Sequence, residues 1–181
     1  MNFPEQLPPV DHNYLSGDPV AFSALVKRYQ SALFGFLGRM GIESAICEEL
    51  AQETFLRAWI NRARYDAEKA SVSTWLFTIA RNLALNHLAK NSRVVGHEPD
   101  FSKLTDTGAD PSDQFEQHQS IARLRQALNT LSTDDREVIA TCYTPEIKNA
   151  SDVLGCSAGA LRTRLSRARQ RLSDALGQLD T

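Results

Sequence analysis

The amino-acid sequence predicts an all-α protein of two small helical domains joined by a flexible linker, with a helix-turn-helix as the C-terminal domain. Two long regions place apolar residues three and four positions apart, which is the spacing of one helix face. No stretch alternates apolar and polar residues between hairpin turns, as half-buried strands do. A segment rich in proline, glycine and small polar residues separates the two regions. We therefore expect a first domain at 1–92, an acidic linker at 93–117 and a second domain at 118–181.

Three helices are expected in the first domain, at about 18–40, 44–60 and 73–90. The apolar positions with helical spacing are Phe22, Leu25, Val26, Tyr29, Leu33, Phe36, Leu37, Ile46, Leu50, Phe55, Leu56, Trp59, Trp75, Leu76, Ile79, Leu83 and Leu88. Ser44 is the expected N-cap of the second helix, and Ser73 or Thr74 that of the third. These apolar faces predict a compact bundle of three or four helices.

The second domain is expected to contain shorter helices. The stretch 118–131 places Ile121, Leu124, Leu128 and Leu131 on one face. Ser132 is the expected N-cap of the next helix, whose first turn is acidic. A third helix is expected to start on Pro145 and to stop at Gly155, since proline suits a first helical position and glycine the residue after a helix. A longer helix capped by Ser157 follows, which predicts a helix-turn-helix.

The formal net charge of -2 conceals an uneven distribution. Basic and acidic residues balance over 1–92, acidic residues dominate 93–117, and the stretch 157–172 carries five arginines and no acidic residue. On a helical wheel, Leu161, Leu165, Ala168 and Leu172 form an apolar stripe, arginines flank it, and Thr163, Ser166 and Gln170 point away from it. Side chains able to bond bases, edged by arginines able to reach phosphates, favour a DNA-binding helix over a solvated amphipathic one.

Other classes of protein are disfavoured. No nucleophile–base pairing, phosphate-binding glycine loop or carboxylate pair with metal-ligand spacing stands out, so we expect no catalysis, no cofactor and no metal. Three cysteines lie far apart without a C-x-x-C pair, which fits a reducing cytoplasm. The first residues lack the features of a signal peptide or a membrane span, so no membrane insertion is expected.

Two sets of motifs resemble bacterial extracytoplasmic-function (ECF) sigma factors of the sigma-70 family. "LSTDDREVIA" and "VLGCSAGALRTRLSRARQRL" resemble their region 4. "GDPVAFSALVKRY", "EELAQETFLRAW" and "STWLFTIARNLALNHL" resemble their region 2, in the same order. The resemblance covers roughly 14–92 and 118–176. It implies a subunit that gives promoter specificity to RNA polymerase and initiates transcription, in the cytoplasm, as a monomer when free and under control of an anti-sigma factor.

The resemblance also implies a role for individual residues. Residues expected to bind the RNA polymerase core are Glu49, Leu50, Gln52, Glu53, Phe55 and Leu56, although Phe55 and the nearby Trp59 fit a plain core role at least as well. Residues expected at the melted -10 promoter DNA are Thr78, Arg81, Asn82, Asn86, Lys90 and Arg93, with the loop 65–73 forming a base pocket. Residues expected at the -35 DNA are Ala158, Gly159, Arg162, Thr163, Ser166, Arg167 and Arg171.

Two departures from the family pattern are visible. The tract around Arg93 is poorer in basic residues than is usual. The stretch 140–155 is short and has Ala150 and Ser151 where the family has Ile and Ala, so the first helix of the helix-turn-helix is expected to be short or displaced. Two alternatives remain: a conventional DNA-binding regulator, which would not need the "LAQETFLRAW" motif, and a helical adaptor, which would leave the arginine helix without a role.

Overall fold

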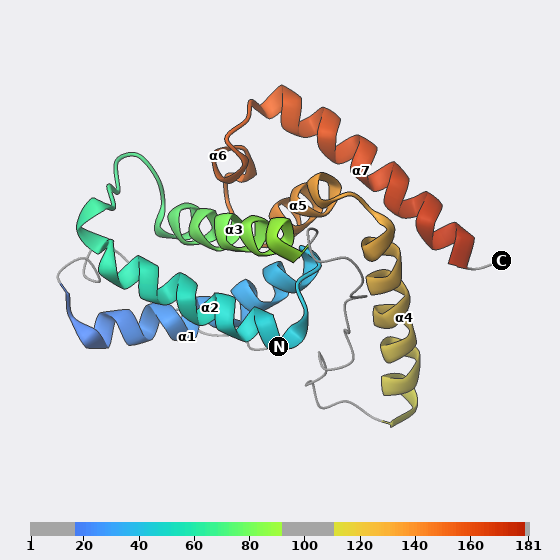
Figure 1. The fold of residues 1–181 in the computed structure, drawn as a ribbon, viewed down its shortest axis with the longest axis horizontal. Coiled ribbons are helices and arrows are strands. Elements are labelled where there is room, and N and C mark those ends of the chain that lie inside the picture. The colour runs from blue at the N-terminus through green and yellow to red at the C-terminus, as the bar shows by residue number, and fades with distance from the viewer. Residues whose placement is uncertain (1–16, 92–110, 180–181) are drawn as a thin grey trace, which may run out of the picture.

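The computed structural model describes residues 17–91 and 111–179, except for the side chains of residues 111–119. The N-terminal stretch 1–16, Arg93 and most of the expected linker lie outside the described residues. The helices are α1 Pro19–Arg39, α2 Ser44–Ile60, α3 Val72–Asn91, α4 Pro111–Thr130, α5 Thr133–Cys142, α6 Ala150–Leu154 and α7 Ala158–Leu179. The described residues contain no strand, so the predicted all-α class is confirmed (Figure 1).

The first three helices form a bundle around an aromatic and aliphatic core. Asp18 caps α1 by accepting a bond from the N–H of Val20, and Pro19 takes the first helical position, where a missing N–H costs nothing. Phe36 and Phe77 are both fully buried and meet edge to face, with ring centroids 5.4 Å apart. Eight of the seventeen side chains predicted as apolar helix faces are buried here: Leu25, Tyr29, Leu33, Phe36, Leu37, Phe55, Leu76 and Leu83. Phe77 and Ala80, which were not predicted, are buried with them.

The predicted N-caps of α2 and α3 are wrong by a small shift. Ser44 is the first residue inside α2, and Glu43 precedes it without a side-chain cap. Ser73 and Thr74 are buried inside α3, while the hydroxyl of Ser71 accepts from the N–H of Thr74 at 3.1 Å. Ser71, Ser73 and Thr74 lie close together at the start of α3, and because the helix begins at the buried Val72, Ser71 is the one that precedes it and caps it.

The second group of helices confirms two predicted caps and corrects one helix. Ser132 caps α5 by accepting from Asp135 N, and Ser157 accepts from Ala160 N at the start of α7. Gly155 ends α6 with φ +61°, a left-handed conformation that favours glycine. Pro145 does not start a helix, because Ile147 N bonds to Thr144 O in a turn that buries the Ile147 side chain. The helix before the glycine turn is therefore short, as the missing family residues predicted.

The two helical groups pack on each other. α5 lies against α1, and α6 lies against α3 (Figure 1). Ala140, Ile147 and Val153 belong to the same buried apolar cluster as the core of α1–α3. A smaller cluster of Leu128, Leu131, Ile139 and Ala168 holds α4, α5 and α7 together. α4 starts at Pro111, within the segment 93–117 that was expected to be the linker.

Candidate nucleic-acid and protein interfaces

The outer side of α7 is open along its N-terminal half. Ala158, Gly159, Arg162, Thr163, Ser166 and Arg167 are all exposed, and we call them the α7 face. A side chain built at Gly159 would meet no atom within 4 Å, so the start of the helix has room for a close neighbour. On the opposite side, Ala168 is fully buried and Leu172 packs on the small apolar cluster. A helix that packs on its own domain along one side and exposes the other side can enter a DNA groove.

Two α7 arginines are held by acidic side chains of α5. Arg171 Nη1 donates to both carboxylate oxygens of Asp135, at 2.8 and 2.7 Å. Arg164 Nη2 donates to Glu137 Oε2 at 3.1 Å. Arg171 was predicted as a DNA contact, and the structure gives it a partner within the chain although its side chain is 57% exposed. Glu137 is an important residue that sequence reasoning missed.

A line of polar side chains runs along α3. Thr78, Asn82, Asn86 and Lys90 are spaced by four residues, which places them on one side of the helix, and we call them the α3 face. Asn82, Asn86 and Lys90 are exposed, whereas Thr78 is half-buried and donates to the backbone oxygen of Thr74 at 2.7 Å. α3 contains no acidic residue, so nothing on the helix itself repels a phosphate backbone.

Arg81, beside the α3 face, is bound by the second helical group. Its Nε donates to Glu137 Oε1 at 2.5 Å, and its Nη1 donates to Asn82 Oδ1 at 3.2 Å. The Glu137 side chain is only 4% exposed. One buried carboxylate therefore joins Arg81 of α3 to Arg164 of α7. No sequence pattern signals this contact, because 56 residues separate Arg81 from Glu137.

The predicted polymerase-binding residues on α2 divide between surface and core. Gln52 and Leu56 lie one turn apart on the outside, Leu56 is 52% exposed, and Ile60 continues the row at 64% exposed. Glu49 is exposed beside this row, and half-buried Glu53 accepts from Arg57 Nε at 2.6 Å. We call Glu49, Gln52, Glu53, Leu56 and Ile60 the α2 face. Exposed aliphatic side chains rimmed by charges are typical of a protein-binding surface. Ile60 was missed because the quoted motif ends before it.

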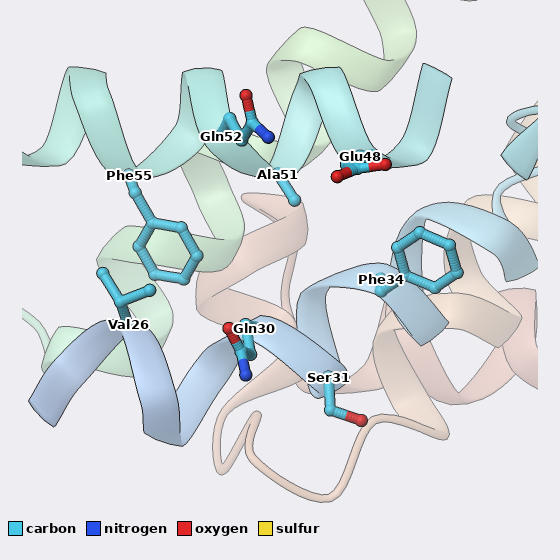
Figure 2. Close-up of a pocket in the computed structure, with 8 residues that line it drawn as sticks. All are labelled: Val26, Gln30, Ser31, Phe34, Glu48, Ala51, Gln52 and Phe55. Carbon is cyan, nitrogen blue, oxygen red and sulfur yellow. The ribbon is translucent and has the colours of Figure 1, made fainter. Parts of the chain in front are cut away.

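Phe55 belongs to the core, as its alternative interpretation predicted. It is 8% exposed and meets Phe22 edge to face, with centroids 6.4 Å apart. Its ring also lies over an open groove between α1 and α2, where it points toward Val26 of the facing helix (Figure 2). Gln30, Ser31, Phe34, Glu48, Ala51 and Gln52 complete the lining. Leu50 is half-buried and packs against the core.

The loop before α3 is ordered by its own contacts. Tyr65 OH donates to the backbone oxygen of Ala70 at 3.0 Å, and its ring lies 5.2 Å from that of Trp75. Asp66 accepts from Lys69 Nζ and from the N–H of Glu68, and these bonds lower the pKa of the Asp66 carboxyl. A loop with a fixed shape beside the α3 face is suited to hold a base outside the duplex.

The contact between the two helical groups also contains charged groups. Arg39 Nη2 donates to Thr144 Oγ1 at 2.7 Å, and burial lowers the pKa of Arg39 and of Arg136. Arg136 lies directly over Gly41, which has φ +87°. Elsewhere, in the part of the chain that the structure describes, no cluster of three potential metal ligands occurs, and none of the helices is long and apolar enough to cross a membrane.

The chain thus combines exposed aliphatic side chains on α2, a polar side of α3 and an arginine-edged helix-turn-helix, a combination expected of promoter-recognition subunits. Family models agree: residues 25–94 match sigma-70 region 2, and residues 121–172 match sigma-70 region 4. The chain belongs to the ECF sigma factors of RNA polymerase. The predicted family and function are thereby confirmed.

Several relatives span nearly the whole chain. It is 30% identical over 158 residues to the ECF RNA polymerase sigma factor RpoE of Cereibacter sphaeroides, covering 86% of each chain. It is 31% identical over 170 residues to the RNA polymerase sigma factor CarQ of Myxococcus xanthus, covering 92% of this chain and 95% of that one. Among solved structures, it resembles the sigma factor RpoE of Bartonella quintana in complex with the anti-sigma factor NepR. That match has a TM-score of 0.69 and 26% identity, over 86% of this chain and 96% of that one.

Proposed function

We propose that the three exposed faces divide the work of a sigma factor. The α2 face binds the RNA polymerase core, the α3 face with the loop 65–73 holds the melted -10 strand, and the α7 face reads the -35 element. The corresponding domains are 1–92 and 118–181, with 93–117 as the linker. The chain performs no catalysis of its own and acts in the cytoplasm, where the polymerase is.

The observation that carries this proposal is the row of exposed aliphatic side chains on α2. Leu56 and Ile60 remain largely exposed although α2 has a buried side that could have taken apolar residues. Exposed apolar groups of this size cost solubility and are retained where a partner covers them. The same helix carries the "LAQETFLRAW" motif, and this coincidence favours a polymerase contact over a plain structural role.

The same surfaces are suited to an anti-sigma factor. The Bartonella quintana relative was solved with the anti-sigma factor NepR, so a sigma factor of this shape binds such a protein. We infer that an anti-sigma factor holds this chain inactive by covering the α2 face. The chain is a monomer when no partner is bound.

Run-off transcription tests the proposal. Core RNA polymerase with the full chain should produce discrete transcripts from genomic fragments, and core polymerase alone should not. Leu56→Ala should weaken copurification with the core about tenfold, because a central apolar contact at an interface is worth about 1–3 kcal/mol. Val20→Ala is the matched control, since Val20 is an aliphatic residue 76% exposed on α1 and outside the α2 face. If both variants lose copurification with the core to the same extent, or if neither loses it, the α2 face does not bind polymerase.

A further inference from the structure

Two hydroxyl side chains of the α7 face differ in their hydrogen bonding. Thr163 Oγ1 donates to the backbone oxygen of Gly159 at 3.2 Å, one turn earlier in the helix. Ser166 is also exposed, and its side chain forms no hydrogen bond with the described residues. The hydroxyl proton of Thr163 is therefore already engaged within the helix, whereas the Ser166 hydroxyl is able to donate or to accept.

The bond to Gly159 decides which part of Thr163 a DNA groove would meet. The Cβ atom of threonine carries a hydroxyl and a methyl group, and when the hydroxyl turns back to the helix backbone the methyl group is left on the outside. Ala160, three residues earlier, is exposed and adds a second methyl group on the same side. A Cβ built at Gly159 would meet no atom within 4 Å, so the surface beside these methyl groups is open.

This small apolar spot lies among cations. Arg162 and Arg167 are exposed and form no ion pair with the described residues. A helix edged by arginines brings its outward groups against base edges when it enters the major groove. Of the four bases, only thymine presents a methyl group there, and threonine methyl groups pack on it. A side chain that exposes a methyl group and cannot donate its proton therefore favours thymine.

We propose that Thr163 reads a thymine of the -35 element through its methyl group and not through a hydrogen bond. This inference rests on the proposed function, because it uses the assignment of the α7 face to -35 DNA, and it adds the identity of a base. On a recognition helix, positions three or four apart contact successive base pairs, so Arg167 lies at the next pair. Arginine bonds to the O6 and N7 atoms of guanine, so the element contains a T·A pair directly beside a G·C pair.

Selection from random DNA tests the identity of the bases. Core RNA polymerase loaded with the full chain is offered a library of duplexes with a randomised segment, and core polymerase alone gives the background. The enriched duplexes should share a T·A pair directly beside a G·C pair. A library made with deoxyuridine in place of thymidine lacks every thymine methyl group. Selection from it should lose the preference at the T·A position and keep the G·C pair.

Two substitutions separate the methyl group of Thr163 from its hydroxyl. Thr163→Ser removes the methyl group and should weaken binding to the enriched duplex about fourfold, the effect of one buried methyl group. Thr163→Val keeps a methyl group without the hydroxyl and should bind as the parent chain does. Replacing the one thymine by uracil should weaken binding of the parent chain about fourfold and should have no further effect on Thr163→Ser.

Thr130→Ser is the matched control. Thr130 is an exposed threonine of α4, outside the α7 face, and its hydroxyl donates to the backbone oxygen of Ala127 at 2.8 Å. This variant should bind the thymine and uracil duplexes as the parent chain does.

The outcomes distinguish this inference from the proposed function. If the parent chain binds the thymine and uracil duplexes equally, or if Thr163→Val loses as much affinity as Thr163→Ser, the thymine contact is wrong, while an enriched duplex still supports the proposed function. If no duplex is enriched above the background of core polymerase alone, the proposed function is wrong and this inference fails with it.

Discussion

At the scale of single residues, the arginines of α7 differ by their partners and not by their charge. Arg164 and Arg171 are each bound by an acidic residue of α5, whereas Arg162 and Arg167 are exposed and make no ion pair with the described residues. An Arg171→Ala change would leave the carboxylate of Asp135, which is 10% exposed, without its cationic partner and with only the hydroxyl of Ser132 as a donor among the side chains described. Such a variant would lose stability as well as any DNA contact, so it is a poor probe of phosphate binding.

Asn82→Ala should impair promoter opening while leaving polymerase binding unchanged. Asn82 is exposed on the α3 face, and its amide can offer both a donor and an acceptor to an extruded base. Permanganate footprinting should show reduced reactivity of -10 thymines on ordinary duplex and recovery on a template mismatched over that region. Asn149→Ala, at an exposed asparagine of the second helical group, is the control and should melt duplex normally. Full opening of the duplex by Asn82→Ala would remove this role.

Cys47 should make the stability of the chain depend on pH in the alkaline range. Burial raises the pKa of its thiol from 9.0 to about 12, so the folded state holds the proton more tightly than the unfolded state. The stabilisation is complete below pH 9 and is lost as the pH rises toward about 12. Relative to Cys47→Ala, the free energy of unfolding should fall by about 1.4 kcal/mol between pH 8 and pH 10, measured by urea titration. Parallel pH profiles for the two proteins would contradict this.

At the scale of elements, helices with a sustained apolar period could be predicted and short ones could not. The bounds of α1 and α2 match the expected stretches closely, because many buried side chains define each period. α6 has only five residues. The prediction that a helix starts at Pro145 was wrong, because the chain there forms a turn that buries Ile147. The cap of α3 is Ser71 for a similar reason. Burial of Val72 in the core fixes where the helix begins, and the sequence alone does not distinguish between the neighbouring hydroxyl residues.

The α7 helix should show two kinds of arginine in DNA binding. Arg167→Ala should weaken binding to the cognate -35 duplex by about 1–3 kcal/mol and relax its base preference. Arg162→Ala should weaken binding to all sequences alike and reduce the salt dependence, as loss of a phosphate contact does. Fluorescence anisotropy against a panel of duplexes at several salt concentrations distinguishes the two. If Arg167→Ala and the parent chain show the same ranking of duplexes, Arg167 does not read bases.

At the scale of the whole molecule, the candidate faces could be predicted but their relation to one another could not. The exposed positions of Asn82 and Arg167 could be predicted because a motif and a helical spacing depend on only a few neighbouring residues. The bond from Arg81 to Glu137 joins two motifs across the chain, and each residue alone looks like an ordinary surface charge. The packing of Ala140, Ile147 and Val153 on the core of α1–α3 could not be predicted either. Apolar residues at these positions fit equally well into the core of their own domain.

Gly41→Ala should open the molecule as well as destabilise it. Gly41 has φ +87°, and an added Cβ would fall on the guanidinium group of Arg136 from the second helical group. Gly155→Ala is the matched control, because Gly155 has φ +61° with no atom within 4 Å of an added Cβ. Both variants should lose about 1–2 kcal/mol of stability from the left-handed backbone. Only Gly41→Ala should enlarge the radius of gyration; equal radii would show that Arg136 yields without separating the two groups.

The double ion pair of Glu137 has a consequence for genetics. The three exposed faces are proposed to contact polymerase or DNA, so substitutions on them should appear as loss-of-function alleles at every temperature. Glu137 lies on none of these faces, and its carboxylate is bound only by arginines of its own chain among the contacts seen here. Substitutions at Glu137 and Gly41 should instead lower the stability of the chain, so they should appear as temperature-sensitive alleles in a promoter–reporter strain. The map of such alleles would outline the contact between the two helical groups.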